Sequence, residues 1–131
     1  MIKNVIFDMD GVLVDSEDAI TLAALEALRS FGVDARYEDF KQFTGMGENM
    51  FVGGVARLHG SEFRTQMKDR TYQIYVGKAG ERVRVFPDAK GVLSALASHG
   101  YGLALASAAD LVKVKANIAC IGVGADIFAA L

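Results

Sequence analysis

The sequence contains few of the residues that would point to several classes of protein. There is one cysteine, Cys120, so no disulfide bond can form within the chain. The two histidines, His59 and His99, are too few for a histidine–cysteine metal cluster. Lysine and arginine form no block and the net charge is −2, which argues against nucleic-acid binding. No apolar run approaches the ~18 residues of a membrane span, so we expect no membrane segment.

Apolar residues, in contrast, are abundant at 52% of the 131 positions. This composition is typical of a globular chain, and the length fits one domain or one domain with an insertion. No signal-like stretch precedes the first apolar segment, so we expect a cytoplasmic location.

Apolar patterning predicts short buried strands separated by helices. Strands are expected at Lys3–Phe7 and Leu103–Ala106, with the start of another at Asp126–Leu131. Helices are expected at Glu17–Phe31, Glu38–Phe43, Glu48–Leu58, Ser61–Tyr75, Asp88–His99 and Leu111–Cys120, with a linker at Gly77–Arg84. This order predicts an α/β core with a parallel sheet, formed by residues 1–16 and 81–131 and interrupted by a helical module at 17–80.

The first predicted strand runs directly into an acidic loop, FDMDGVLVDS, which carries Asp8, Asp10 and Asp15. Carboxylates crowded in this way repel each other unless they all face water or a positive group lies among them. In parallel α/β sheets the ligand crevice lies beyond the carboxyl ends of the strands. Asp8 and Asp10 follow the first strand and Ser107 follows the second, so we expect them to meet in one crevice.

These residue types suit the transfer of a phosphoryl group. Asp8 and Asp10 offer hard oxygen ligands for Mg²⁺, and a carboxylate can also act as a nucleophile or as a general acid/base. Gly11 permits a tight turn beside an anion, while Ser107 and the amides that follow it, from Ala108 onward, could bind phosphoryl oxygens. The alternative is a solvent-exposed acidic loop whose aspartates only satisfy turns and helix caps.

The stretch Phe7–Ser16, together with LALASA at Leu103–Ala108, resembles the haloacid dehalogenase-like hydrolase superfamily. The resemblance extends over Ile2–Leu131, and the inserted helices are similar to the helical cap of the β-phosphoglucomutase-like subfamily. It implies a Rossmann-like core. The stretches Phe43–Ala56 and Ala106–Ile118 are also similar to the hydrolase-like domain of a larger plant thylakoid protein. A chloroplast location is therefore the alternative if the chain comes from a plant or alga.

The resemblance also implies a chemistry. Asp8 would be the nucleophile, and Asp10 the general acid/base, with its main-chain carbonyl toward Mg²⁺. Ser107 would bind the transferring group. The implied activity is that of a Mg²⁺-dependent phosphatase of small phosphorylated metabolites. Ile20 and Asn49 stand where mutase members carry a histidine and an arginine, which favours a phosphatase over a mutase.

Two features of the family are expected to be missing. The family carries a lysine after the third strand and an acidic pair after the fourth, and the chain is expected to end before either, as a fragment that lacks these late motifs. Lys113 and Lys115, only a few residues past Ser107, are expected to be solvated surface charges. The core would then be incomplete, and its open sheet edge is a predicted site of association. A second reading is therefore a catalytically inactive interaction or regulatory module, or a part of a larger multidomain protein.

The remaining candidates have plainer interpretations. His59 and His99 each precede a glycine at a predicted helix end, where they can meet the helix dipole. Cys120 is expected to be a small core residue. The Gly53–Gly54 pair could line a substrate loop or allow close packing of helices, and the sequence favours neither.

Overall fold

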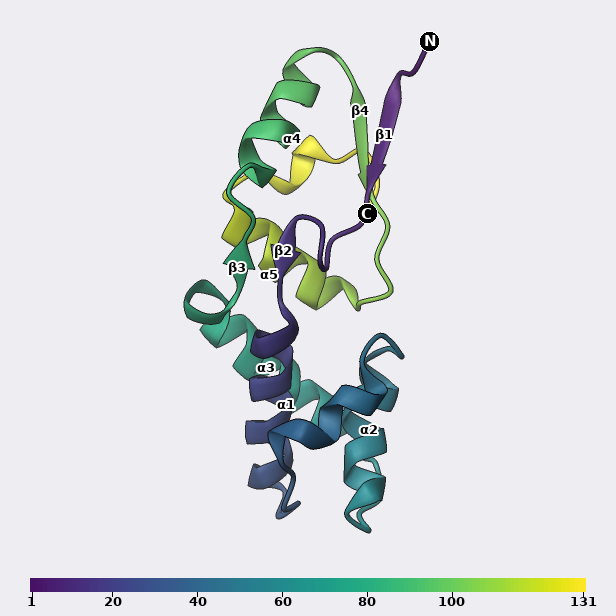
Figure 1. Cartoon of the computed structure of the whole chain (residues 1–131), viewed down its shortest axis with the longest axis vertical. Helices are drawn as coiled ribbons and strands as arrows, with labels where there is room; N and C mark the ends of the chain where they lie inside the picture. Colours follow the sequence, from purple (N-terminus) through teal and green to yellow (C-terminus); the bar gives the residue numbers. More distant parts are fainter. The chain divides into compact units, whose positions relative to one another are not determined.

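A computed structural model describes all of residues 1–131 and shows an α/β core with an inserted group of helices (Figure 1). The elements are β1 (Asn4–Phe7), β2 (Val14–Asp15), α1 (Glu17–Ser30), η1 (Tyr37–Phe43), α2 (Glu48–Leu58), α3 (Thr65–Arg82), β3 (Arg84–Val85), α4 (Ala89–Ser98), β4 (Gly102–Leu105), α5 (Leu111–Ile121) and η2 (Ala125–Ile127). They divide into two compact units: an α/β unit, Met1–Ser16 with Ala79–Leu131, and a helical unit, Glu17–Lys78.

The sheet of the α/β unit is parallel, which confirms the prediction made from the order of the elements. β1 pairs with β4, with Asn4 opposite Gly102 and Phe7 opposite Leu105 (Figure 1). The predicted strand at Asp126–Leu131 is only partly formed. Residues 125–127 form the short helix η2, and Ala130 makes a single parallel bridge to Ala104 of β4.

The core of the α/β unit lies against one face of this sheet. Its buried members are Met9, Leu13, Val14, Ala89, Leu93, Leu103, Leu105, Val114, Ile118, Ile121 and Phe128. Val5 and Phe7 of β1 pack against this cluster, whereas Ile6 between them is 70% exposed. Successive side chains of a strand point to opposite faces. The pattern along β1 therefore means that only one face of this strand is covered.

A second pairing was not predicted from the sequence. β2 and β3 form a short antiparallel pair, with Val14 opposite Val85 and Asp15 opposite Arg84. The predicted linker at Gly77–Arg84 is wrong, because α3 continues to Arg82 and β3 follows at once. The linker was predicted because this stretch contains glycines, each of which costs about 1 kcal/mol in a helix relative to alanine. Packing of α3, as at the buried Ala79, offsets that cost.

The helical unit consists of α1, η1, α2 and most of α3. α1 buries the apolar face that its periodicity predicts, and Gly32 follows it with φ +80°, a conformation that favours glycine. The short helix predicted at Glu38–Phe43 is the 3₁₀ helix η1. The helix predicted to begin at Ser61 begins only at Thr65, and the Ser61 hydroxyl donates to the Glu62 carbonyl.

The glycine pair in α2 allows close packing inside the helical unit. Gly53 and Gly54 are both buried. A Cβ atom built on Gly54 would lie 2.5 Å from the nearest atom of the Phe43 ring, and one on Gly53 would lie 3.0 Å from Phe63. The interpretation as close helix packing is therefore correct for this pair.

This packing gives a matched pair of predictions for stability. Gly54→Ala is expected to destabilise the protein by about 1–3 kcal/mol, because the added methyl group overpacks against Phe43. Gly77→Ala in α3 is expected to stabilise it by about 0.5–1 kcal/mol, since an added Cβ there meets nothing within 4 Å. Urea unfolding of the two variants measures both effects. Equal effects of the two substitutions would contradict this account of the packing.

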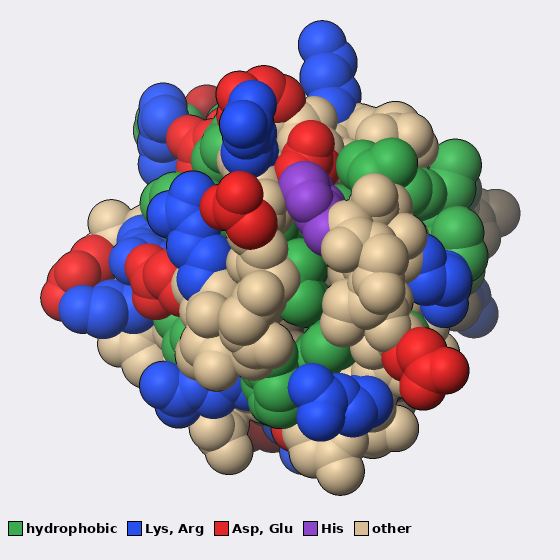
Figure 2. Space-filling model, turned by 90° about the horizontal axis from the view of Figure 1, so that it is seen from below, with side chains coloured by type: hydrophobic (Ala, Val, Ile, Leu, Met, Phe, Trp, Pro, Cys, Tyr) green, Lys and Arg blue, Asp and Glu red, His purple; other side chains and the backbone are tan.

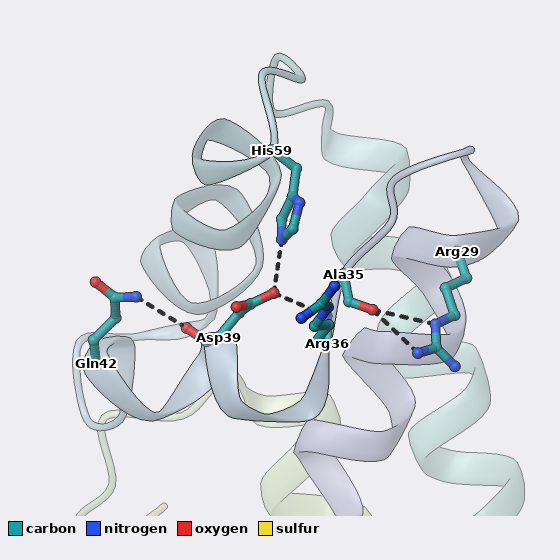
Figure 3. Close-up of polar contacts among 6 residues, drawn as sticks. All are labelled: Arg29, Ala35, Arg36, Asp39, Gln42 and His59. Carbon is teal, nitrogen blue, oxygen red and sulfur yellow. Dashed lines mark hydrogen bonds and ion pairs between the residues drawn. The ribbon is translucent and has the colours of Figure 1, made fainter.

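Polar contacts tie η1 to its neighbours in the helical unit (Figure 3). The Asp39 carboxylate lies 2.7 Å from His59 Nε2 and accepts the Arg36 amide at 2.8 Å. Arg29 of α1 donates to the Ala35 carbonyl from two nitrogens, at 3.2 and 3.3 Å. The hydrogen bond from His59, followed by the one from the Arg36 amide, lowers the pKa of Asp39 below its ordinary value.

The lowered pKa of Asp39 predicts an acid-sensitive contribution to stability. A depressed carboxyl pKa stabilises the folded state above the unfolded pKa of about 4, and that contribution is lost as the pH falls through the folded value. Asp39→Asn is therefore expected to lower the free energy of unfolding at pH 6 and to have little effect near pH 2. The exposed Asp69 of α3 provides the control variant Asp69→Asn. A pH-independent effect of Asp39→Asn would contradict the prediction.

The surface seen in Figure 2 mixes charges of both signs. Lysine and arginine side chains are interspersed with aspartate and glutamate over this face, with hydrophobic side chains between them. No helix in the chain combines the length and the apolar character that crossing a membrane requires.

Candidate active site

Two loops leave the same edge of the parallel sheet, one after β1 and one after β4. Phe7 and Leu105 are partners at the ends of these strands, and the Ala106 amide donates to the Phe7 carbonyl at 2.9 Å. Asp8 follows Phe7 directly, and Ser107 lies two residues beyond Leu105. The sheet thus brings together the starts of the two predicted site loops, although about a hundred residues separate them in the chain.

The loop after β1 is built around Met9. This side chain is fully buried, and its carbonyl accepts the amides of Val12, Leu13 and Val14 at 2.9–3.3 Å. Gly11 has φ +80°, so it makes the tight turn predicted for it. Its amide donates to the Val14 carbonyl at 2.7 Å, so the amide is engaged within the loop. A role for Gly11 beside a bound anion stays a prediction.

Asp10 is held by two donors that converge on one oxygen. The Ser16 hydroxyl donates to Asp10 Oδ1 at 2.5 Å, and Lys113 Nζ lies 3.5 Å from the same atom. The Lys113 side chain is 7% exposed, whereas the Asp10 side chain is 36% exposed. The prediction that Lys113 is a solvated surface charge is therefore wrong. Lys115, two residues further along α5, is exposed as predicted.

Asp8 and Ser107 make only local contacts. Asp8 is exposed, and its Oδ1 accepts the Met9 amide at 2.8 Å. The half-buried Ser107 accepts the Ala109 amide at its hydroxyl oxygen, at 3.1 Å, while Ala108 is exposed. The Ser107 hydroxyl thus orders the loop that leads into α5. Binding of a phosphoryl group by Ser107 or by the Ala108 amide stays a prediction.

The donor set fits a Mg²⁺ ion in part. Mg²⁺ commonly takes one or two carboxylates and completes its shell with phosphate and water. The exposed Asp8 carboxylate meets that need, and Asp10, with Oδ1 engaged by Ser16 and Lys113, would contribute its main-chain carbonyl. The structure contains no group of three or more histidine, cysteine, aspartate or glutamate side chains that could hold a metal by themselves. Substrate oxygens and water would have to supply the remaining ligands.

The structure also gives the positions of the other candidate residues. Asp15, the last aspartate of the acidic loop, lies in β2 opposite Arg84. His59 follows α2 and His99 follows α4, and the His99 ring lies 2.7 Å from the Ala95 carbonyl, which agrees with their predicted positions at helix ends. Cys120 is half-buried, and burial raises the pKa of its thiol, which makes it a poor nucleophile.

Sequence reasoning missed two residues of the cluster, Ser16 and Lys113. Ser16 was considered only as the end of the stretch Phe7–Ser16, although its hydroxyl donates to Asp10. A weak signal for Lys113 exists in the helical period of α5. Lys113 and Asn117 are spaced by one helical turn, and both are buried beside Val114 and Ile118.

A parallel α/β core with an inserted helical unit, carboxylates after the first strand and a serine after the next defines a class of Rossmann-like hydrolases. The sequence profile of the family described as "Haloacid dehalogenase-like hydrolase" matches residues 5–127. The chain belongs to this family.

Known proteins similar to the chain agree with this assignment. "Protein SUPPRESSOR OF QUENCHING 1, chloroplastic" from Arabidopsis thaliana is 36% identical over 99% of this chain and 13% of its own length. "Phosphoglycolate phosphatase" from Yersinia pseudotuberculosis is 31% identical over 79% of this chain and 47% of its own length. The crystal structure of CbbY from Rhodobacter sphaeroides in complex with phosphate has a TM-score of 0.82 at 23% identity, which shows a shared fold.

The chain is considerably shorter than these proteins. The structural match to CbbY includes 99% of this chain but only 62% of the CbbY chain. The sequence matches span less than half of the length of the Arabidopsis and Yersinia proteins.

Proposed function

We propose that the chain is a phosphatase-type hydrolase of small phosphorylated metabolites, and that it acts through a phosphorylated Asp8. The observation that carries this proposal is the placement of Asp8, Asp10 and Ser107 on two loops that leave the same end of paired parallel strands. A nucleophile, an acid/base group and a hydroxyl donor are what phosphoryl transfer to a carboxylate requires.

The chemistry would proceed in two steps. In the first, a carboxylate oxygen of Asp8 attacks phosphorus, the bond from phosphorus to the ester oxygen breaks, and Asp10 gives its proton to the departing alkoxide. In the second, Asp10 takes a proton from water as the water oxygen attacks the phosphorus of phospho-Asp8. Inorganic phosphate leaves, and both aspartates regain their starting states. Ser107 would donate a hydrogen bond to a phosphoryl oxygen throughout.

Mg²⁺ is part of this proposal, held by the Asp8 carboxylate and the Asp10 main-chain carbonyl. When bound, it supplies positive charge that neutralises the phosphoryl oxygens. The structural support is the exposed Asp8 carboxylate beside an Asp10 side chain whose Oδ1 is already occupied by other donors.

A phosphatase is favoured over a mutase. A mutase must hold a second phosphate group, and the positions where such members carry a histidine and an arginine hold Ile20 and Asn49 here. Ile20 is 6% exposed in α1 and cannot serve a polar role. Asn49 is exposed at the start of α2 and carries no charge to hold a phosphate.

The second candidate function is a non-catalytic interaction or regulatory module, or a part of a larger multidomain protein. It is favoured by the 13% share of the Arabidopsis relative that the chain matches, and by the lack of a complete acidic metal cluster. The uncovered face at Ile6 and the edge of β1 would be its association surface. If the chain comes from a plant or alga, we propose a chloroplast location, since that relative is named as chloroplastic.

Phosphate release from p-nitrophenyl phosphate, phosphoglycolate and a panel of sugar phosphates tests the proposal. Release is expected to require Mg²⁺, to fall to background when EDTA is added, and to return when Mg²⁺ is restored in excess. Metal-independent release would remove Mg²⁺ from the proposal. No release from any substrate at any Mg²⁺ concentration would favour the non-catalytic module.

A further inference from the structure

The α/β unit contains a buried basic group in contact with the Asp10 carboxylate. Lys113 is 5% exposed, and its Nζ lies 3.5 Å from Asp10 Oδ1. Burying an ammonium group is costly unless an anion or hydrogen-bond acceptors compensate it. A lysine at this depth is therefore unlike a surface ion pair, in which both side chains stay solvated and the contact contributes little.

The arrangement of donors around Asp10 is asymmetric. Ser16 Oγ, from a residue that is itself 3% exposed, and Lys113 Nζ both contact Oδ1. The Asp10 side chain nevertheless keeps 36% of its surface exposed. One carboxylate oxygen is thus anchored by two protein groups, while the side chain as a whole stays partly exposed.

We infer that Lys113 is a positioning residue, which together with Ser16 anchors Asp10 by Oδ1 and so presents Oδ2 to the substrate. This role rests on the proposed function, in which Asp10 transfers the proton. General acid/base catalysis depends on hydrogen-bond geometry, and a carboxylate free to rotate spends less time in the productive orientation. Lys113 lies in the first turn of α5, so the helix that follows the Ser107 loop also steadies the loop of Asp10.

Three variants on α5 test this role. Lys113→Met removes the charge and keeps a long side chain, Lys113→Arg keeps the charge, and Lys115→Met is the exposed control. With p-nitrophenyl phosphate as substrate, Lys113→Met is expected to lower kcat by about 10- to 100-fold with little change in KM. Lys113→Arg should recover part of that loss, and Lys115→Met should match the unaltered chain.

Two measurements that need no turnover separate this inference from the proposed function. In the ¹³C spectrum, Lys113→Met should move the carboxyl signal of Asp10 and leave that of Asp8 in place. In a double-mutant cycle, the fall in unfolding midpoint caused by Lys113→Met should shrink by more than half when Asp10→Asn is already present. A chain that gives both results without releasing phosphate would overturn the proposed function alone.

Other results would overturn the inference itself. An additive cycle, or an Asp10 carboxyl signal unmoved by Lys113→Met, would show that Lys113 does not hold this carboxylate. In an active chain, a rise in KM at constant kcat would assign Lys113 to substrate binding instead of positioning.

Discussion

Replacing Asp8 with asparagine is expected to reduce phosphate release by more than about 10³-fold, because the amide oxygen is a far weaker nucleophile than the carboxylate. The fold should survive the change. Asp8 is exposed, and its Oδ1 accepts the Met9 amide, a hydrogen bond that the asparagine side chain can also accept. The measurement is the rate of phosphate release at saturating Mg²⁺, with circular dichroism to verify folding.

Asp15→Asn provides the matched control for this experiment. Asp15 belongs to the same acidic loop, but it lies in β2, where it pairs with Arg84 of β3. Its substitution is expected to leave phosphate release within a few-fold of the unaltered chain. Equal losses in Asp8→Asn and Asp15→Asn would mean that the overall negative charge of the loop matters, and not a nucleophile at Asp8.

The second large effect concerns the stability of the sheet that carries the site. Leu103→Ala in β4 is expected to cost about 2–5 kcal/mol, since Leu103 is 2% exposed within the core cluster and its truncation leaves a cavity. Such a loss is a large part of the total stability of a typical domain, about 5–15 kcal/mol. Chemical unfolding monitored by circular dichroism measures the change.

Ile6→Ala is the corresponding control on the open face of the same sheet. Ile6 is 70% exposed in the middle of β1, so its truncation is expected to change the free energy of unfolding by about 0.5 kcal/mol or less. A large loss of stability in Ile6→Ala would show that this face is covered in solution, as the association proposed for the sheet edge requires.

The regular features of this fold follow from local patterns in the sequence. β1 and β4 are short apolar runs bounded by turn residues, and α1 has a helical apolar period closed by Gly32. The parallel sheet followed from the alternation of these elements. The meeting of the Asp8 and Ser107 loops followed from the rule that parallel strands end at the same edge, which needs no tertiary information.

The features that were missed depend on contacts between distant residues. Lys113 looked like any exposed lysine, because only the folded α/β unit places its ammonium beside Asp10. The pairing of β2 with β3 joins residues that are about seventy positions apart, and each strand is too short to show a period. The continuation of α3 past Gly77 was missed because glycine propensity favours an end to the helix there, whereas packing sustains it.

The most direct test of the account is to look for a phosphorylated aspartate. The chain would be incubated with acetyl phosphate and Mg²⁺, quenched in acid, digested, and its peptides sequenced by mass spectrometry, with Asp8→Asn treated in parallel. The account predicts an acyl phosphate on Asp8 of the unaltered chain and none in the variant. Modification of another residue, or no modification at any acetyl phosphate concentration, would contradict it.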